Sequence, residues 1–188
     1  AKPLRKSIRV NTLLTTVKQV QAWAQREHWQ LEPVPWCPEA FFVDRDVALR
    51  RAQGDITALG KDLLHLLGHV YVQEAASMLP AALLDAQPGE TILDMSAAPG
   101  SKTTQLAAAM ENTGIIVAND PNEKRLGTLK AALQRAGVVN ALVTKREGQW
   151  FGHHLTERFD RVLCDAPCTA QGTARKDPDA LKYCSEMN

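Results

Sequence analysis

Hydrophobic positions follow two different patterns along this chain. From about residue 90 onward, short β-branched apolar runs alternate with longer segments whose apolar residues recur at helical spacing. The short runs predict strands at 91–95, 115–119, 141–144 and 161–164. The longer segments predict helices at 101–110 and 123–136. Strands that alternate with helices in this way predict an α/β fold built on a parallel sheet that is covered on both faces.

The first part of the chain has no such repeat. A strand is predicted at 7–10, Thr16 can cap a helix that runs to about residue 28, and a second strand is predicted at 41–43. Prolines interrupt the segment between the helix and the second strand. These features predict a compact α+β lobe. We interpret its three tryptophans as core residues rather than as platforms for stacked bases.

A leucine-rich connector joins this lobe to the α/β repeat. Residues 59–67 predict one or two helical turns, and residues 75–84 predict a helix. We place the boundary after residue 68. The expected organisation is therefore a front lobe, residues 1–68, followed by an α/β domain, residues 69–188.

Composition and charge narrow the classes of protein that fit. The 188 residues are 45% hydrophobic and 23% charged, and no run approaches the roughly 18 apolar residues of a membrane span. The four cysteines form no C-x-x-C pair, and His65 and His69 lack a third ligand nearby, so we expect a cytoplasmic protein without disulfides, metal or membrane contact. Residues 1–36 carry a net charge of +4 and the remainder −3. This asymmetry indicates contact with a polyanion such as RNA, and an ordinary solvated surface is an equally open explanation.

The strand at 91–95 leads into a loop with the composition of a cofactor-binding turn. Asp94 precedes small residues and Gly100, and a Ser/Thr cluster then opens the next helix. Gly100 is the loop's only glycine, so neither the G-x-G-x-x-G nor the Walker A pattern is present. A loop for S-adenosylmethionine (SAM) fits, with Asp120, 20 residues beyond Gly100, as the acid that binds the ribose. An ordinary strand-to-helix turn is the alternative.

Asp165 and Cys168 follow the strand at 161–164 in the order Asp-Ala-Pro-Cys. The carboxyl ends of parallel strands meet at one edge, so both residues are expected near the loop after Asp94. An acid and a thiol beside a methyl donor suit methylation of cytosine C5. In that reaction a thiolate adds to C6 and an acid near N3 stabilises the charge that develops in the ring. A buried structural thiol after a turn is the alternative.

Together these segments resemble the Sun-type RNA (cytosine-5-)-methyltransferases, most closely the bacterial branch that acts on 16S rRNA of the small subunit. The resemblance extends over nearly the whole chain and rests on several ordered motifs, at residues 7–12, 71–80, 94–104, 119–120, 165–168 and 172–178. It implies a Rossmann-like SAM-dependent methyltransferase sheet, SAM as cofactor, and rRNA or the small ribosomal subunit as partner. We expect a monomer.

The resemblance also implies roles for individual residues. The segment that contacts SAM comprises Ser96, Ala97, Ala98, Pro99, Gly100, Ser101 and Lys102. Asp120 would bind the ribose, and Glu147 stands near the adenine, where the family usually has Asp. Asp165 would lie between cofactor and cytosine, and Cys168 would assist release of the product. Asp165 and Cys168 are thus the expected catalytic residues.

One motif of the family has no counterpart here. Its nucleophile is a later Thr-Cys pair, and Cys184 comes too early to match it. We therefore expect a fragment of a longer protein, with an incomplete sheet and no methyl transfer of its own.

Other functions stay open at this point. One alternative is a catalytically silent SAM- or RNA-binding fragment or short form, and another is tRNA as the substrate. A third is DNA-type chemistry in which Cys168 is the attacking thiol.

Overall fold

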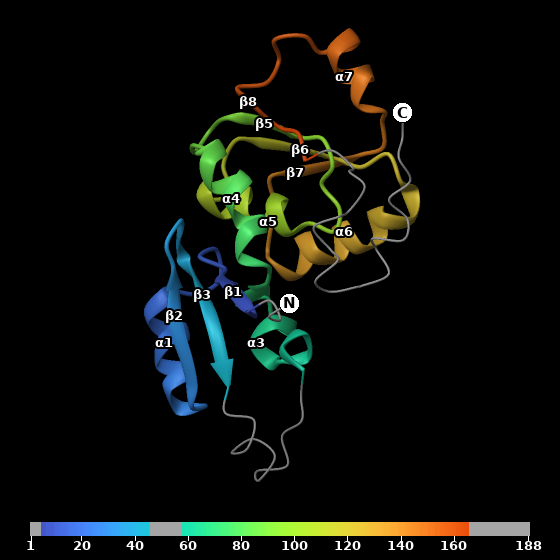
Figure 1. Cartoon of the computed structure of the whole chain (residues 1–188). Coiled ribbons are helices and arrows are strands. Elements are labelled where there is room, and N and C mark those ends of the chain that lie inside the picture. The colour runs from blue at the N-terminus through green and yellow to red at the C-terminus, as the bar shows by residue number, and fades with distance from the viewer. Residues whose placement is uncertain (1–4, 46–57, 166–188) are drawn as a thin grey trace, which may run out of the picture.

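The computed structural model describes residues 5–45 and 58–165, which form two lobes, each around its own four-stranded sheet (Figure 1). The front lobe has an antiparallel sheet with strand order β2-β3-β1-β4, and the second lobe has a parallel sheet with order β7-β6-β5-β8. An α/β fold with an α+β lobe in front of it was predicted, and the two sheets agree with it.

The front sheet consists of β1 (Ser7–Val10), β2 (Trp29–Val34), β3 (Cys37–Arg45) and β4 (Val70–Val72). Helix α1 (Val17–Arg26) packs on it and begins with a capping box, in which Thr16 and Gln19 bond each other's backbone N–H groups. This helix is confirmed at both ends to within two residues.

Strand β2 was not predicted, because it contains Pro33 and is followed closely by Pro35 and Pro38. Pro33 is tolerated since β2 lies at the edge of the sheet, where one row of backbone N–H groups needs no strand partner. The pairing with β3 shifts register between Pro33 and Val34. Trp23 and Trp29 meet edge to face with ring centroids 4.7 Å apart, as expected of core residues. Trp36 differs, because it is 38% exposed.

The connector forms the one or two helical turns that were expected, whereas the front sheet extends beyond the expected lobe boundary. The connector forms a 3₁₀ turn, η1 (Leu59–Lys61), and a short helix, α3 (Leu63–Leu66). Strand β4 then pairs antiparallel with β1. The front sheet therefore takes in residues 70–72, beyond the boundary at residue 68 that the sequence suggested, because their side chains complete its core.

The parallel sheet confirms all four predicted strands: β5 (Thr91–Asp94), β6 (Ile115–Asn119), β7 (Ala141–Thr144) and β8 (Arg161–Leu163). Three helices cover one face, α4 (Ala75–Leu84), α5 (Ser101–Ala109) and α6 (Glu123–Arg135). Helix α7 (Gly148–His154) lies on the other face (Figure 1). It was not predicted, because seven residues with two glycines and two histidines carry little helical signal.

The chain order of these strands fixes where a ligand can bind. Along the chain, β6 is placed next to β5 and β7 next to β6, on the same side of β5. The next strand, β8, lies on the opposite side of β5. The strand order therefore reverses between β5 and β8. In open parallel sheets the crevice at such a reversal, outside the carboxyl ends of the strands, is the usual ligand site.

The two lobes are held together by direct backbone and side-chain contacts. Asn11 Nδ2 donates to the carbonyl oxygens of Gly68 and Ala136, both at 2.9 Å. Gly68 lies so close to helix α6 that a Cβ atom there would come within 1.9 Å of the Arg135 carbonyl oxygen, and its φ is +78°. Only glycine fits at this crossing.

We predict that Gly68→Ala lowers the free energy of unfolding by about 2–4 kcal/mol, since the added methyl group clashes with backbone and the residue has a positive φ. Gly127→Ala is the matched control, because nothing lies within 4 Å of its Cβ position inside α6. There the change should stabilise by about 0.5–1 kcal/mol. Urea unfolding of both variants checks this, and equal effects at the two positions would contradict the close packing of the lobes.

Candidate cofactor and active site

Three carboxylates lie where the strands of the parallel sheet end. Asp94 is the last residue of β5, Asp120 directly follows β6, and Asp165 comes two residues after β8. Since β5 lies between β6 and β8, the three acids share one edge of the sheet, at the point where the strand order reverses. The candidate site is this edge.

The loop between β5 and α5 is held tightly against its neighbours. Ala97 N–H donates to the Asn119 carbonyl at 2.7 Å, and Gly100 N–H donates to the Ala97 carbonyl at 2.7 Å. Gly100 has a φ of +107°, and a Cβ atom there would lie 2.9 Å from the Ala132 Cβ of α6. The glycine therefore both makes the turn and lets the loop pack on α6.

Asp94 is buried beneath this loop and incompletely satisfied. Its Oδ2 accepts from Thr103 Oγ1 at 2.7 Å, whereas its Oδ1 is buried and has no hydrogen-bond partner. Burial raises the pKa of the Asp94 carboxyl to about 6. Buried acceptors in proteins are normally bonded by protein groups, ordered water or a ligand. A ligand donor compatible with this oxygen is the ammonium group of an amino-acid moiety.

Asp120 is fully buried and already well bonded. Its Oδ1 accepts from Asn122 N–H at 2.9 Å, and its Oδ2 accepts from Ala98 N–H at 3.2 Å. Arg125 Nη1 forms an ion pair with Oδ2 at 3.2 Å, and Arg125 Nη2 donates to the Ala98 carbonyl. Asp120 thus positions the loop, and the half-exposed Arg125 side chain lies over it.

Lys102 and Asp165 join the start of α5 to the end of β8. Lys102 Nζ lies 2.6 Å from Asp165 Oδ2, with side chains that are 16% and 50% exposed. Solvent screens such a pair mainly on the Asp165 side. Lys102 thus holds one carboxylate oxygen of Asp165, whose side chain is half exposed.

Asn119 lies in the site as well, although no role was predicted for it. It is fully buried, and its Nδ2 donates to the carbonyls of Met95, at 3.2 Å, and Arg146, at 2.9 Å. Its Oδ1 accepts from Arg146 N–H at 2.8 Å. Asn119 thereby ties the loop after β5 to the loop after β7. The sequence carried one indication of this role, because Asn119 is a polar residue at the end of an otherwise apolar strand.

Glu147 lies on this second loop, where it precedes α7 and makes no capping hydrogen bond. It is exposed, and the adjacent Gly148 lies close to Met95, since a Cβ atom there would be 2.6 Å from Met95 Cε. Glu147 is therefore beside the cofactor loop and available to a ligand.

The structure brings together the residues expected to bind the cofactor, namely Ser96, Ala97, Ala98, Pro99, Gly100, Ser101, Lys102, Asp120, Glu147 and Asp165, along one edge of the sheet. Cys168, the second expected catalytic residue, lies outside the described residues. The individual roles of these residues stay predictions.

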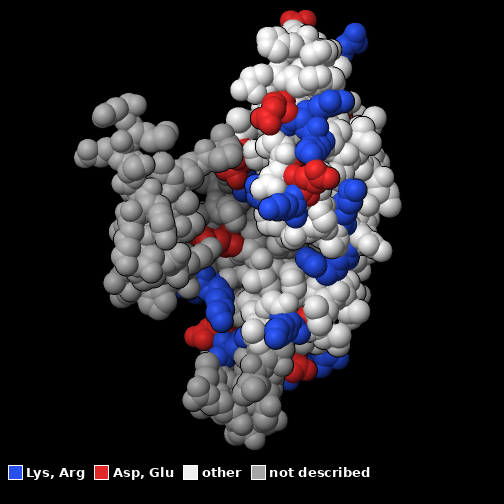
Figure 2. Space-filling view, turned by 90° about the vertical axis from the view of Figure 1, so that its right-hand side faces the viewer, with Lys and Arg blue, Asp and Glu red and all other residues white. Residues whose placement is uncertain are grey.

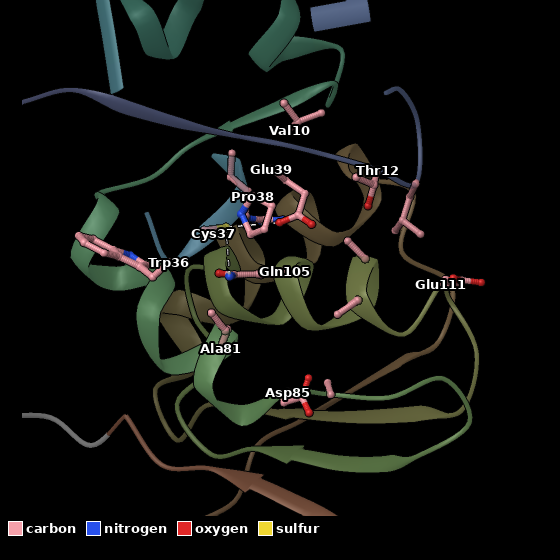
Figure 3. A pocket seen from close by; sticks show the side chains of 16 residues that line it. Val10, Thr12, Trp36, Cys37, Pro38, Glu39, Ala81, Asp85, Gln105 and Glu111 are labelled. Carbon is pink, nitrogen blue, oxygen red and sulfur yellow. Dashed lines mark hydrogen bonds between the residues drawn. The ribbon is translucent and has the colours of Figure 1, made fainter. Parts of the chain in front are cut away.

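A cavity of about 760 Å³ lies elsewhere, between the front lobe and helices α4 and α5 (Figure 3). Glu39, Asp85 and Glu111 line it, together with Trp36. None of the acids at the strand ends contributes to this cavity, so it is separate from the candidate site. In the part of the chain described, no three His, Cys, Asp or Glu side chains cluster so as to hold a metal ion, and no helix could span a membrane.

Comparison with known proteins identifies the family. The family described as 16S rRNA methyltransferase RsmB/F matches residues 81–186, more than half of the chain, and the N-terminal domain of 16S rRNA methyltransferase RsmF matches residues 1–75. The chain belongs to the RsmB/F family. The expected resemblance is thus confirmed, and the two matched segments fall on the two lobes.

Individual RsmB/F relatives agree with this. The chain is 48% identical over its whole length to ribosomal RNA small subunit methyltransferase F of Cronobacter sakazakii, and 47% identical over 96% of its length to that of Vibrio cholerae. It spans only 38% and 37% of those proteins.

Solved structures confirm the Rossmann-like fold of SAM-dependent methyltransferases. A methyltransferase homologue from Pyrococcus horikoshii superimposes with a TM-score of 0.80 at 38% identity, covering 97% of this chain and 57% of that one. NSun6 from the same organism, solved with SFG, gives a TM-score of 0.75 at 21% identity over 89% of this chain and 64% of that one.

The raised pKa of Asp94 predicts how the free energy of unfolding depends on pH. An unfolded chain has the ordinary Asp pKa of about 3.9, and the folded protein has a pKa of about 6. Between these values the folded state binds more protons than the unfolded state, so this group lowers the free energy of unfolding as the pH rises. Asp94→Asn, which keeps the size of the side chain, removes this dependence.

The stability of Asp94→Asn relative to the unmodified chain should therefore increase between pH 4 and pH 7, by up to about 3 kcal/mol. Urea unfolding at a series of pH values measures the difference. A difference that stays constant over this range would mean that Asp94 titrates as an exposed acid does.

Proposed function

We propose that the protein to which this chain belongs is a cytoplasmic methyltransferase that transfers a methyl group from SAM to cytosine C5 in 16S rRNA. The observation that carries the proposal is the group of acids, Asp94, Asp120 and Asp165, at the strand reversal of an RsmB/F-family sheet. The charges of this group suit a cationic cofactor beside a polar base.

The amino-acid end of SAM would be held between Asp94 and the first turn of α5. The unpartnered Oδ1 of Asp94 is an acceptor for its ammonium group. The first N–H groups of a helix have no partner within the helix and favour an anion. Ser101 and Lys102 open α5, so their N–H groups suit the carboxylate of the cofactor.

The nucleoside end would lie across the ends of β6 and β7. Asp120 is the acid proposed for the ribose hydroxyls, and Glu147, exposed at the start of α7, is the group nearest the adenine position. Because Arg125 pairs with Asp120, its flexible side chain must swing aside before the ribose can reach the carboxylate.

The chemistry of transfer assigns Asp165 to the base. SAM supplies an electrophilic methyl group, and cytosine C5 becomes nucleophilic only after a thiolate has added to C6. Asp165, whose Oδ2 is held by Lys102, is proposed to lie with its other oxygen at N3 of the base. A proton held between that oxygen and N3 stabilises the negative charge that develops in the ring when the thiolate adds. Cys168 is proposed to assist product release. We assign the attacking thiolate to no residue of this chain.

Cofactor binding tests the proposal through two neighbouring residues. In the whole protein, Asp120→Ala should weaken SAM binding at least about tenfold, since it removes both the ribose acid and the acceptor that holds Ala98 N–H. Arg125→Met should bind SAM as tightly as the unmodified protein or more tightly, because it uncovers Asp120. Isothermal titration calorimetry measures both.

Methyl transfer from labelled SAM to a 16S rRNA transcript by the same protein, with the modified base mapped, is the accompanying measurement. We expect 5-methylcytosine in the rRNA. Transfer to tRNA instead, or no heat from SAM with a folded protein, would overturn the proposal.

A further inference from the structure

Several basic residues lie on helix α6 and on the loop after β7. We define the α6 face as Lys124, Lys130, Arg135 and the neighbouring Arg146, which follows β7. Figure 2 shows several Lys and Arg residues on one side of the molecule, with Asp and Glu residues among them. The net charge of the whole chain is only +1, so this grouping is local.

Within the described residues, the four members of the α6 face form no ion pair with a carboxylate, whereas other basic residues nearby do. Lys145 is paired with Glu123 at 2.6 Å, and Arg125 is paired with Asp120. No carboxylate in the described ranges forms an ion pair with a member of the α6 face. Glu147 is exposed beside Arg146, so the face is most basic along α6 itself.

Two of these charges are held in place by aromatic rings. The Arg135 guanidinium lies 5.6 Å from the centre of the Tyr71 ring, and that of Arg146 lies 4.8 Å from the centre of the Trp150 ring. A guanidinium that lies over an aromatic ring is held in place although none of its N–H groups is bonded to a carboxylate. Such preordered arginines lose little entropy when they bind phosphate.

The shape and position of the α6 face also suit an extended polyanion. Three of the exposed positions of α6 between Lys124 and Arg135 are small, at Gly127, Thr128 and Ala131, so a backbone can approach closely there. From Lys124 to Arg135 the helix rises about 16 Å, enough to follow two or three phosphates. Asp120 lies just before the helix begins. At its other end, Ala136 contacts the front lobe through Asn11.

We propose that the α6 face binds the phosphate backbone of the substrate RNA and leads it from the front lobe to the cofactor edge. This inference rests on the proposed function, since it assumes that the substrate is RNA. It assigns the RNA contact to α6, whereas the distribution of charge along the sequence indicates the basic front lobe as the contact with a polyanion.

The test compares two matched pairs of exposed lysines and arginines in the whole protein. The first is the double variant Lys124→Ala, Lys130→Ala on α6, and the second is Lys18→Ala, Arg26→Ala on α1. Binding to a 16S rRNA transcript is measured by fluorescence anisotropy at several salt concentrations. SAM binding is measured by calorimetry as a control for folding.

The α6 pair should weaken RNA binding about tenfold or more and reduce the slope of log K against log salt by about 1.5, with SAM binding unchanged. The α1 pair should change both by much less. If the α6 pair binds RNA like the unmodified protein, or the α1 pair loses as much, the inference is wrong while the proposed function stands. If the unmodified protein binds SAM but no RNA, the proposed function itself fails.

Discussion

The first turn of helix α5 makes the contacts on which the rest of this structure depends. Within residues 101–104, Thr103 bonds the buried Asp94 and Lys102 pairs with Asp165. The Ser101 carbonyl and Thr104 Oγ1 accept from Arg9 Nη2 of the front lobe, at 3.2 and 2.8 Å. One helical turn therefore joins two strand ends of the parallel sheet and the other lobe, so a shift in any of them moves the others.

Arg9 shows how firmly the lobes are joined. Its side chain is 2% exposed, and its Nε donates to Gln73 Oε1 at 3.2 Å. Burial lowers the pKa of the Arg9 guanidinium to about 10, so it stays charged at neutral pH. A buried charge whose hydrogen-bond acceptors are neutral is stable only while those acceptors stay in place. The front lobe is thereby held in one position on the cofactor helix.

The sequence predicted the parallel sheet well because each of its strands is a short apolar run between turn residues. It also predicted which loops meet, since parallel strands must end at one edge. It did not predict β2, where prolines conceal an edge strand, or α7, which is too short for periodicity. The role of Asn119 and the ion pair of Arg125 with Asp120 were out of reach as well, because both depend on distances between loops that only folding brings together.

The most direct test is the SAM affinity of the Thr103→Val variant of the whole protein. Valine keeps the shape of the side chain but lacks the hydroxyl group that bonds Asp94. Isothermal titration calorimetry at pH 7.5 should show affinity at least about tenfold lower while the protein stays folded. The unpaired Asp94 oxygen should also lower the unfolding midpoint, and Thr103→Ser should restore most of both. Undiminished affinity in Thr103→Val would contradict the claim that the first turn of α5 organises the site.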